Sequence, residues 1–164
     1  MATEIFIEDR FSCSPQKLYD LLSNDQFDDE LMKALKMGKT KQSEQKVSDG
    51  TELKIRLTSP DEIPAIAKKF TGDHLSYVET RRWFDSKLSN TWQIIPEVKG
   101  ATVEAKGTTD IVADGEGCIR RTKGTISVNL PLIGRKIEEM VLKTITETFK
   151  QNADYCRKYM SENP

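Results

Sequence analysis

The chain has few of the residues from which metal sites and disulfide frameworks are built. Its 164 residues include three cysteines and one histidine. Cys13, Cys118 and Cys156 are odd in number, far apart and without Cys-x-x-Cys spacing, so neither a zinc site nor a disulfide framework is indicated. We expect buried thiols in a reducing compartment, with no metal and no other cofactor.

The sequence also lacks a long apolar run and an excess of charge of either sign. No stretch approaches the ~20 apolar residues that span a bilayer, and the N-terminus has no secretory pattern. Lys and Arg number 25 against 26 Asp and Glu, so the broad basic surface of a nucleic-acid binder is absent. We expect a cytoplasmic protein without a nucleic-acid partner. The oligomeric state is not indicated.

The length and the apolar content suit one domain over residues 1–164. The composition is 37% hydrophobic and 31% charged, and a chain of this size can bury a core without metal or disulfide links. Alternation of apolar and charged residues predicts a sheet with one wet face. The predicted strands cover residues 3–12, 39–47, 53–58, 73–85, 87–95, 101–113 and 118–130.

Helical patterns interrupt and then follow these strands. Ser14 and Asn24 are typical N-caps of two short helices, the second ending at Gly38. Residues 60–70 predict a further helical segment, because four apolar residues share one face. A long amphipathic helix of about 26 residues follows Gly134. Strands closed by one helix predict an α+β fold, a curved antiparallel sheet of about six to seven strands wrapped on that helix.

The apolar face of the long helix contains three polar residues. Thr144, Thr148 and Asn152 follow one another at intervals of four. Because an unpartnered buried polar group costs ~1–3 kcal/mol, they predict a ligand cavity, or threonines that bond back to the carbonyl one turn earlier. The surrounding stripe consists of Ile133, Ile137, Val141, Ile145 and Cys156.

One predicted strand places Tyr77, Glu79, Arg81 and Trp83 on one face. If that face points inward, Glu79 and Arg81 form a buried acid–base pair with perturbed pKa values. If it points outward, they form a solvated charge pattern. Trp83 and Trp92 suit either a core or a stacking surface for a ligand.

Lysines gather near the second short helix. They are Lys33, Lys36, Lys39, Lys41 and Lys46. This cluster indicates either a transient contact with anionic lipid headgroups or a solvated face. His74, at a strand start, has no visible partners for a triad or a metal site and is expected on the surface.

The element order resembles that of the START-like superfamily, which includes birch-pollen allergens, polyketide cyclases and lipid-transfer proteins. Three segments are more narrowly similar to a bacterial family of unknown function within the superfamily. The segments are Arg82-Trp83-Phe84, Thr91-Trp92 and Val128–Glu138. The resemblance implies a helix-grip fold with two short helices after strand 1, and a cavity for an apolar molecule, often a lipid, sterol or polyketide. It carries over no catalytic residue.

Three hypotheses follow. The first is a binding protein that holds an apolar small molecule, above all a lipid, between sheet and helix. Such a protein could serve in transport or sensing. The second is a cyclase- or hydrolase-type enzyme using Glu79, Tyr77 or Arg81. The third is a structural module with a solid core. The predicted ligand-binding residues are Tyr77, Trp83, Trp92, Ile137, Val141, Thr144, Ile145, Thr148 and Asn152.

Overall fold

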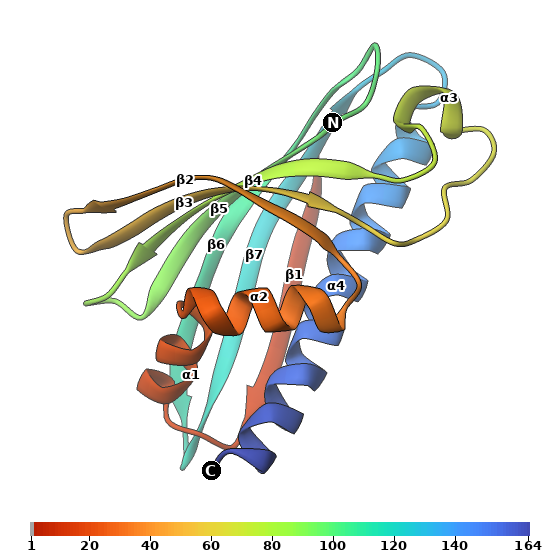
Figure 1. The fold of residues 1–164 in the computed structure, drawn as a ribbon. Helices are drawn as coiled ribbons and strands as arrows, with labels where there is room; N and C mark the ends of the chain where they lie inside the picture. The colour runs from red at the N-terminus through yellow and green to blue at the C-terminus, as the bar shows by residue number, and fades with distance from the viewer. Residues whose placement is uncertain (1) are drawn as a thin grey trace.

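A seven-stranded antiparallel sheet curves around one long helix (Figure 1). The computed structural model describes residues 2–164. Within them the strands are β1 Ala2–Phe11, β2 Gly38–Val47, β3 Gly50–Thr58, β4 Ser76–Phe84, β5 Ser89–Pro96, β6 Thr102–Asp114 and β7 Gly117–Asn129. Their order in the sheet is β1-β7-β6-β5-β4-β3-β2. The predicted α+β helix-grip architecture is confirmed.

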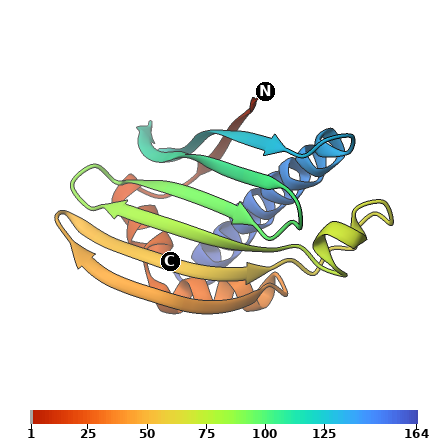
Figure 2. The same ribbon diagram turned by 90° about the horizontal axis from the view of Figure 1, so that it is seen from above.

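The helices α1 (Pro15–Leu22), α2 (Asp25–Ala34) and α4 (Gly134–Glu162) lie on one face of the sheet (Figures 1 and 2). The predicted caps are present: the Ser14 side chain accepts a hydrogen bond from the Lys17 amide, and Asn24 accepts one from Phe27. The 29 residues of α4 span about 44 Å at 1.5 Å per residue. This length lets α4 run along the sheet, chiefly over β1 and β7.

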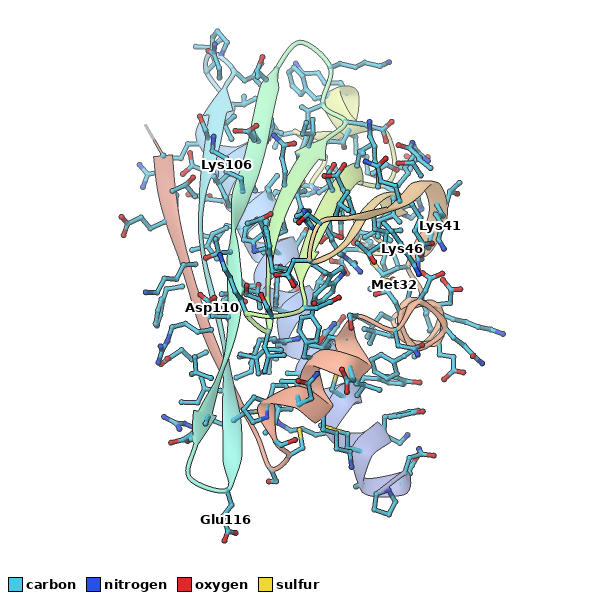
Figure 3. The ribbon with its side chains drawn as sticks, turned by 90° about the vertical axis from the view of Figure 1, so that its left-hand side faces the viewer. Met32, Lys41, Lys46, Lys106, Asp110 and Glu116 are labelled. Atoms are coloured by element: carbon cyan, nitrogen blue, oxygen red, sulfur yellow. The ribbon has the colours of Figure 1, made fainter. Side chains whose placement is uncertain are left out.

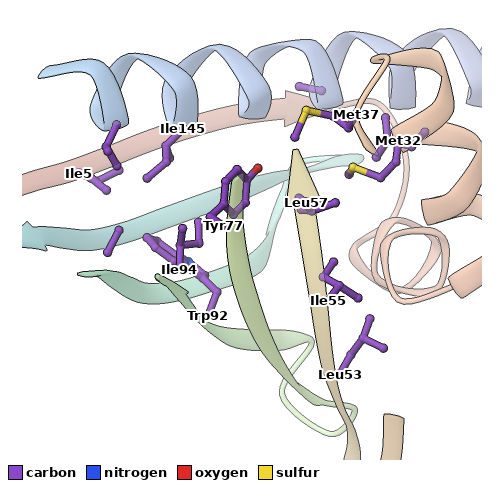
Figure 4. Packing of buried hydrophobic residues seen from close by; sticks show 14 of the residues in the cluster. Ile5, Met32, Met37, Leu53, Ile55, Leu57, Tyr77, Trp92, Ile94 and Ile145 are labelled. Atoms are coloured by element: carbon purple, nitrogen blue, oxygen red, sulfur yellow. The ribbon is translucent and has the colours of Figure 1, made fainter. Parts of the chain in front are cut away.

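The opposite face of the sheet is wet, as the alternation predicts. Lys106 and Asp110 are exposed on β6, whereas Val103 and Ala105 on the same strand are buried (Figure 3). Figure 4 shows the inner side, where Tyr77 lies between sheet and helices and Ile145 descends from α4. Apolar side chains of both layers form one continuous core.

The segment between β3 and β4 differs from the prediction. Residues 60–70 were expected to be helical, but helix α3 covers Lys68–Thr71 alone. Pro64 gives the physical reason, because proline lacks the amide proton that a helix interior requires and clashes with the preceding turn. Ile63 and Ala67 are nevertheless buried, as their shared apolar pattern indicates.

The second short helix also ends earlier than predicted. It stops at Ala34 rather than at Gly38, and Lys36 takes a positive φ of 59° in the connection to β2. No helix within residues 2–164 combines the length and the apolar character needed to cross a bilayer.

Candidate functional site

Two small cavities lie between the inner face of the sheet and the helices. The first has a volume of about 80 Å³ and the second of about 60 Å³. They share four lining residues: Glu79, Arg81, Phe149 and Asn152. We call the two cavities together the chamber. At ~15 Å³ for each water, the first cavity has room for about five water molecules and the second for about four.

Strand β4 supplies the charged wall of the chamber. Tyr77, Glu79, Arg81 and Trp83 all point inward, because they occupy alternate positions of a strand whose other face is wet. The sequence pattern left both directions open, and the structure therefore places the acid–base pair inside. Burial raises the pKa of the Tyr77 phenol.

Arg81 is the centre of a buried ion network that joins the sheet to α2. Its guanidinium donates to Asp28 Oδ1 at 2.9 Å and to Glu79 Oε2 at 3.0 Å. The second oxygen of Asp28 accepts a hydrogen bond from Lys39 Nζ at 2.6 Å. Burial by itself would raise the pKa of Asp28, but the charges and hydrogen bonds of Arg81 and Lys39 outweigh it and hold that pKa below its usual value.

A second buried ion pair closes the chamber on the side of β1 and β7. Arg120 is 2% exposed and donates to Asp9 at 2.8 Å and to the carbonyl oxygen of Phe149 at 3.1 Å. It also donates to Asn152 Oδ1. Arg120 was not among the predicted site residues. The sequence nevertheless predicts its position, since Arg120 is two residues after Cys118 and therefore on the same face of β7 as the other inward residues.

The chamber also contains two polar atoms without partners. Within residues 2–164, Asn90 Oδ1 and Trp92 Nε1 are buried and form no hydrogen bond. Both residues line the first cavity and occupy consecutive inward positions of β5. The Asn90 residue is 9% exposed and Trp92 is 4% exposed. Nearly all buried polar groups in folded proteins have partners, so this unpaired donor and this unpaired acceptor need an explanation.

Two glycines make room for the indole of Trp92. Gly107 and Gly124 face each other in the β6–β7 ladder, beside Trp92 on β5. A Cβ at either position would lie within 2.8 Å of the indole ring. The absence of a side chain at both positions therefore leaves the space that the indole ring occupies beside the β6–β7 backbone.

The predicted site residues fall into two groups. Trp83, Trp92 and Asn152 line the first cavity, and Tyr77, Ile145, Thr148 and Asn152 line the second. The remaining three are buried in the packed core and line neither cavity. They are Ile137, Val141 and Thr144.

Asn152 lines both cavities, and its role in ligand binding stays a prediction. Its Oδ1 already has partners inside the protein, since it accepts from Arg120 and from the Cys156 thiol. The amide therefore positions the Arg120 guanidinium at the chamber wall. Thr148 keeps its predicted place beside the second cavity and also borders a groove on the outer surface.

The lysine cluster is less cationic than the sequence indicates. Lys39 is paired with Asp28 and Asp29, and Lys41 with Asp25 and Glu44. These pairs neutralise two of the five lysines considered for a lipid surface, and the membrane contact stays a prediction. Within residues 2–164 no group of His, Cys, Asp and Glu side chains has the arrangement of a metal site.

A curved sheet closed by a long helix over an internal chamber defines the START-like class of helix-grip proteins. A START superfamily protein from Mycobacterium smegmatis has a TM-score of 0.60 and 14% identity to this chain, with 99% of each chain covered. The aromatase/cyclase Zhui from Streptomyces sp. R1128 has a TM-score of 0.70 and 7% identity, covering 98% of this chain and 96% of its own.

Norcoclaurine synthase from Thalictrum flavum, solved with dopamine and hydroxybenzaldehyde, is also similar. Its TM-score is 0.63 at 16% identity, and the match covers 100% of this chain and 89% of the synthase. Identities this low establish a common fold and nothing about ligand or reaction.

Residues 7–160 match the family described as "Protein of unknown function (DUF2505)", and the chain belongs to that family. A search of the curated proteins found no match. The predicted likeness to START-like proteins is confirmed at the level of the fold, and the predicted membership of a family of unknown function is confirmed.

Proposed function

We propose that this protein binds one small organic molecule in the chamber between sheet and α4. The observation that carries the proposal is that Asn90 Oδ1 and Trp92 Nε1 are buried without partners in two residues that line the first cavity. Leaving such groups unpaired costs ~1–3 kcal/mol each. A bound molecule that pairs with both would recover this free energy, and a solid structural core would have no reason to keep them.

The cavity volumes favour a small ligand over the lipid expected from the family resemblance. Pockets for drug-sized ligands measure ~300–1,000 Å³, whereas the two cavities measure about 80 and 60 Å³. A lipid or a sterol would need the helices to move away from the sheet. The aromatic walls formed by Trp83, Trp92 and Phe149 suit a ligand of ring size.

Native mass spectrometry of the protein purified from its own host tests the proposal. We expect a non-covalent adduct of low mass that the Trp92→Phe and Asn90→Leu variants lose or retain at reduced occupancy. Thr91→Val is the matched control, since Thr91 lies between the two residues on the exposed face of β5. If the wild-type protein and all variants fold equally well in this host and none of them carries an adduct, the proposed binding function is refuted.

A second candidate function is catalysis, and the position of Glu79 favours it. This carboxylate lines both cavities and is oriented by Arg81, as a general base facing a bound molecule would be. Two of the solved structures with this fold carry the names of enzymes.

The variant Glu79→Gln separates the two functions. If the protein only binds, the ligand identified by mass spectrometry remains unchanged on incubation with wild-type protein. If Glu79 is a base, NMR in D₂O shows conversion of the ligand or deuterium exchange at its carbon atoms, and Glu79→Gln abolishes this signal while the ligand still binds.

A further inference from the structure

The charges that face the chamber cancel. Within residues 2–164, four charged residues line the first cavity: Asp28, Glu79, Arg81 and Arg120. Glu79 and Arg81 are also the charged residues of the second cavity. Each cavity therefore has equal numbers of positive and negative side chains.

Every one of these charges already has a partner inside the protein. Arg81 lies 2.9 Å from Asp28 and 3.0 Å from Glu79. Arg120 lies 2.8 Å from Asp9, a carboxylate behind the chamber wall. A charged ligand would thus enter without an available counter-charge. It would have to break a buried pair or stay unpaired, and burial of an uncompensated charge is strongly unfavourable.

The two unpartnered atoms favour an uncharged ligand that forms hydrogen bonds. Trp92 Nε1–H can only donate, and Asn90 Oδ1 accepts. The two residues are two positions apart on β5, which separates their Cα atoms by roughly 7 Å. A group that both accepts and donates, such as a primary amide or a hydroxyl, satisfies the two atoms without carrying charge.

We infer that the ligand of the chamber is a neutral molecule of about one ring in size that presents both a hydrogen-bond acceptor and a donor. Size sets the upper limit: an engineered apolar cavity that accepts benzene measures ~150 Å³, and the two cavities of the chamber, which share four lining residues, come close to that volume only when taken together. This inference rests on the proposed binding function and narrows it to one chemical class. Fatty acids and other carboxylates are excluded from the class.

Three probes that each contain one benzene ring but differ in polarity test the inference. Benzamide is neutral and both accepts and donates, benzoate is its anionic isostere, and toluene has no hydrogen-bonding group. In ligand-observed NMR titrations at pH 7 with the full chain, we expect benzamide to bind at least tenfold more tightly than benzoate. Toluene should bind at least threefold more weakly than benzamide.

Variants locate the interaction. Trp92→Phe removes the donor and Asn90→Leu removes the acceptor, and each should weaken benzamide at least threefold while leaving toluene unchanged. Thr91→Val, on the outer face of the same strand, should bind all probes as the wild type does.

Several outcomes would overturn the inference. If benzoate binds as tightly as benzamide and Trp92→Phe weakens benzoate binding, the chamber binds ligands but the assignment of a neutral ligand is wrong. If benzamide binds with no effect of either variant, the site is misplaced. If no probe binds, the assigned size and class are wrong. The proposed binding function is decided separately by the adduct observed in native mass spectrometry.

Discussion

Neighbouring residues on β7 form one ion pair inside the protein and one outside. Arg120 faces inward and pairs with Asp9, and their side chains are 3% and 12% exposed. Arg121 faces outward and pairs with Glu8, with exposures of 35% and 34%. Both pairs join β7 to β1 in the same register. We predict that Arg120→Met strongly destabilises the fold, whereas Arg121→Met does not.

The magnitudes follow from burial. Removal of Arg120 leaves a nearly buried carboxylate without its cation, for which the cost is ~3–5 kcal/mol. At ~2–4 °C per kcal/mol for a chain of this size, Tm should fall by about 6–20 °C. The exposed pair contributes ~0–1 kcal/mol, so Arg121→Met should lower Tm by no more than about 4 °C.

Chemical denaturation of single and double variants measures both effects. Replacing Arg120 by Met and Asp9 by Asn together removes the buried charges, so the double variant should be at least ~1.5 kcal/mol more stable than the sum of the single effects implies. The outer pair, Arg121 and Glu8, should couple by less than ~1 kcal/mol. If Arg121→Met costs as much as Arg120→Met, or the inner cycle shows no coupling, the buried network has no special role in stability.

Three further perturbations have defined outcomes. Asp28→Asn should be less stable than wild type by ~1–3 kcal/mol at pH 7. Because the pKa of Asp28 is lowered in the folded state, the stabilisation by its charge is present above the unfolded pKa of ~3.9 and is lost as pH falls through the folded pKa. The difference in the free energy of unfolding between variant and wild type should therefore narrow in acid. Gly124→Ala, whose new methyl group would lie 2.4 Å from a carbonyl oxygen and 2.8 Å from the neighbouring indole, should cost ~1–3 kcal/mol and change the tryptophan fluorescence, whereas Gly134→Ala, with its nearest neighbour at 3.7 Å, should be neutral or stabilising. Thr148→Phe, beside the second cavity, should abolish ligand binding and lower Tm less than Thr144→Phe, which overpacks a solid part of the core at ~1–3 kcal/mol.

Each of these predictions has a clear contrary result. A stability difference between Asp28→Asn and wild type that stays constant from pH 7 to pH 3 would contradict the charge network assigned to Asp28. Gly124→Ala with wild-type Tm and fluorescence would mean that the indole is not confined by the glycine. Equal destabilisation by Phe at positions 144 and 148 would mean that the second cavity cannot accept a side chain.

The alternation of residues in the strands determined which face of the sheet is buried. Leu53, Ile55 and Leu57 alternate with polar residues, and all three are buried in β3. Caps at Ser14 and Asn24 determined where the short helices begin, because a side-chain oxygen three residues before an amide satisfies it by local geometry. Such features depend on neighbours in the chain and can therefore be predicted from the sequence.

Helical periodicity was less reliable where a proline intervened. The shared face of residues 60–70 predicted a helix, but Pro64 limits the helix to the last residues of that segment. Burial of Ile63 followed the pattern all the same, since an apolar side chain can reach the core from a loop as well as from a helix.

The chamber depended on tertiary structure. Alternation placed Glu79 and Arg81 on one face of β4, but only the assembled sheet decided that this face points inward, because the charges there are balanced by Asp28 from α2. The partner of Asn152 comes from β7, 32 residues earlier in the chain. Contacts between residues so distant in sequence have no local pattern. The sequence thus determined the α+β class and the buried faces. The packing of α2, α4 and the sheet decided which polar groups meet and which two, among residues 2–164, are buried without a hydrogen-bond partner.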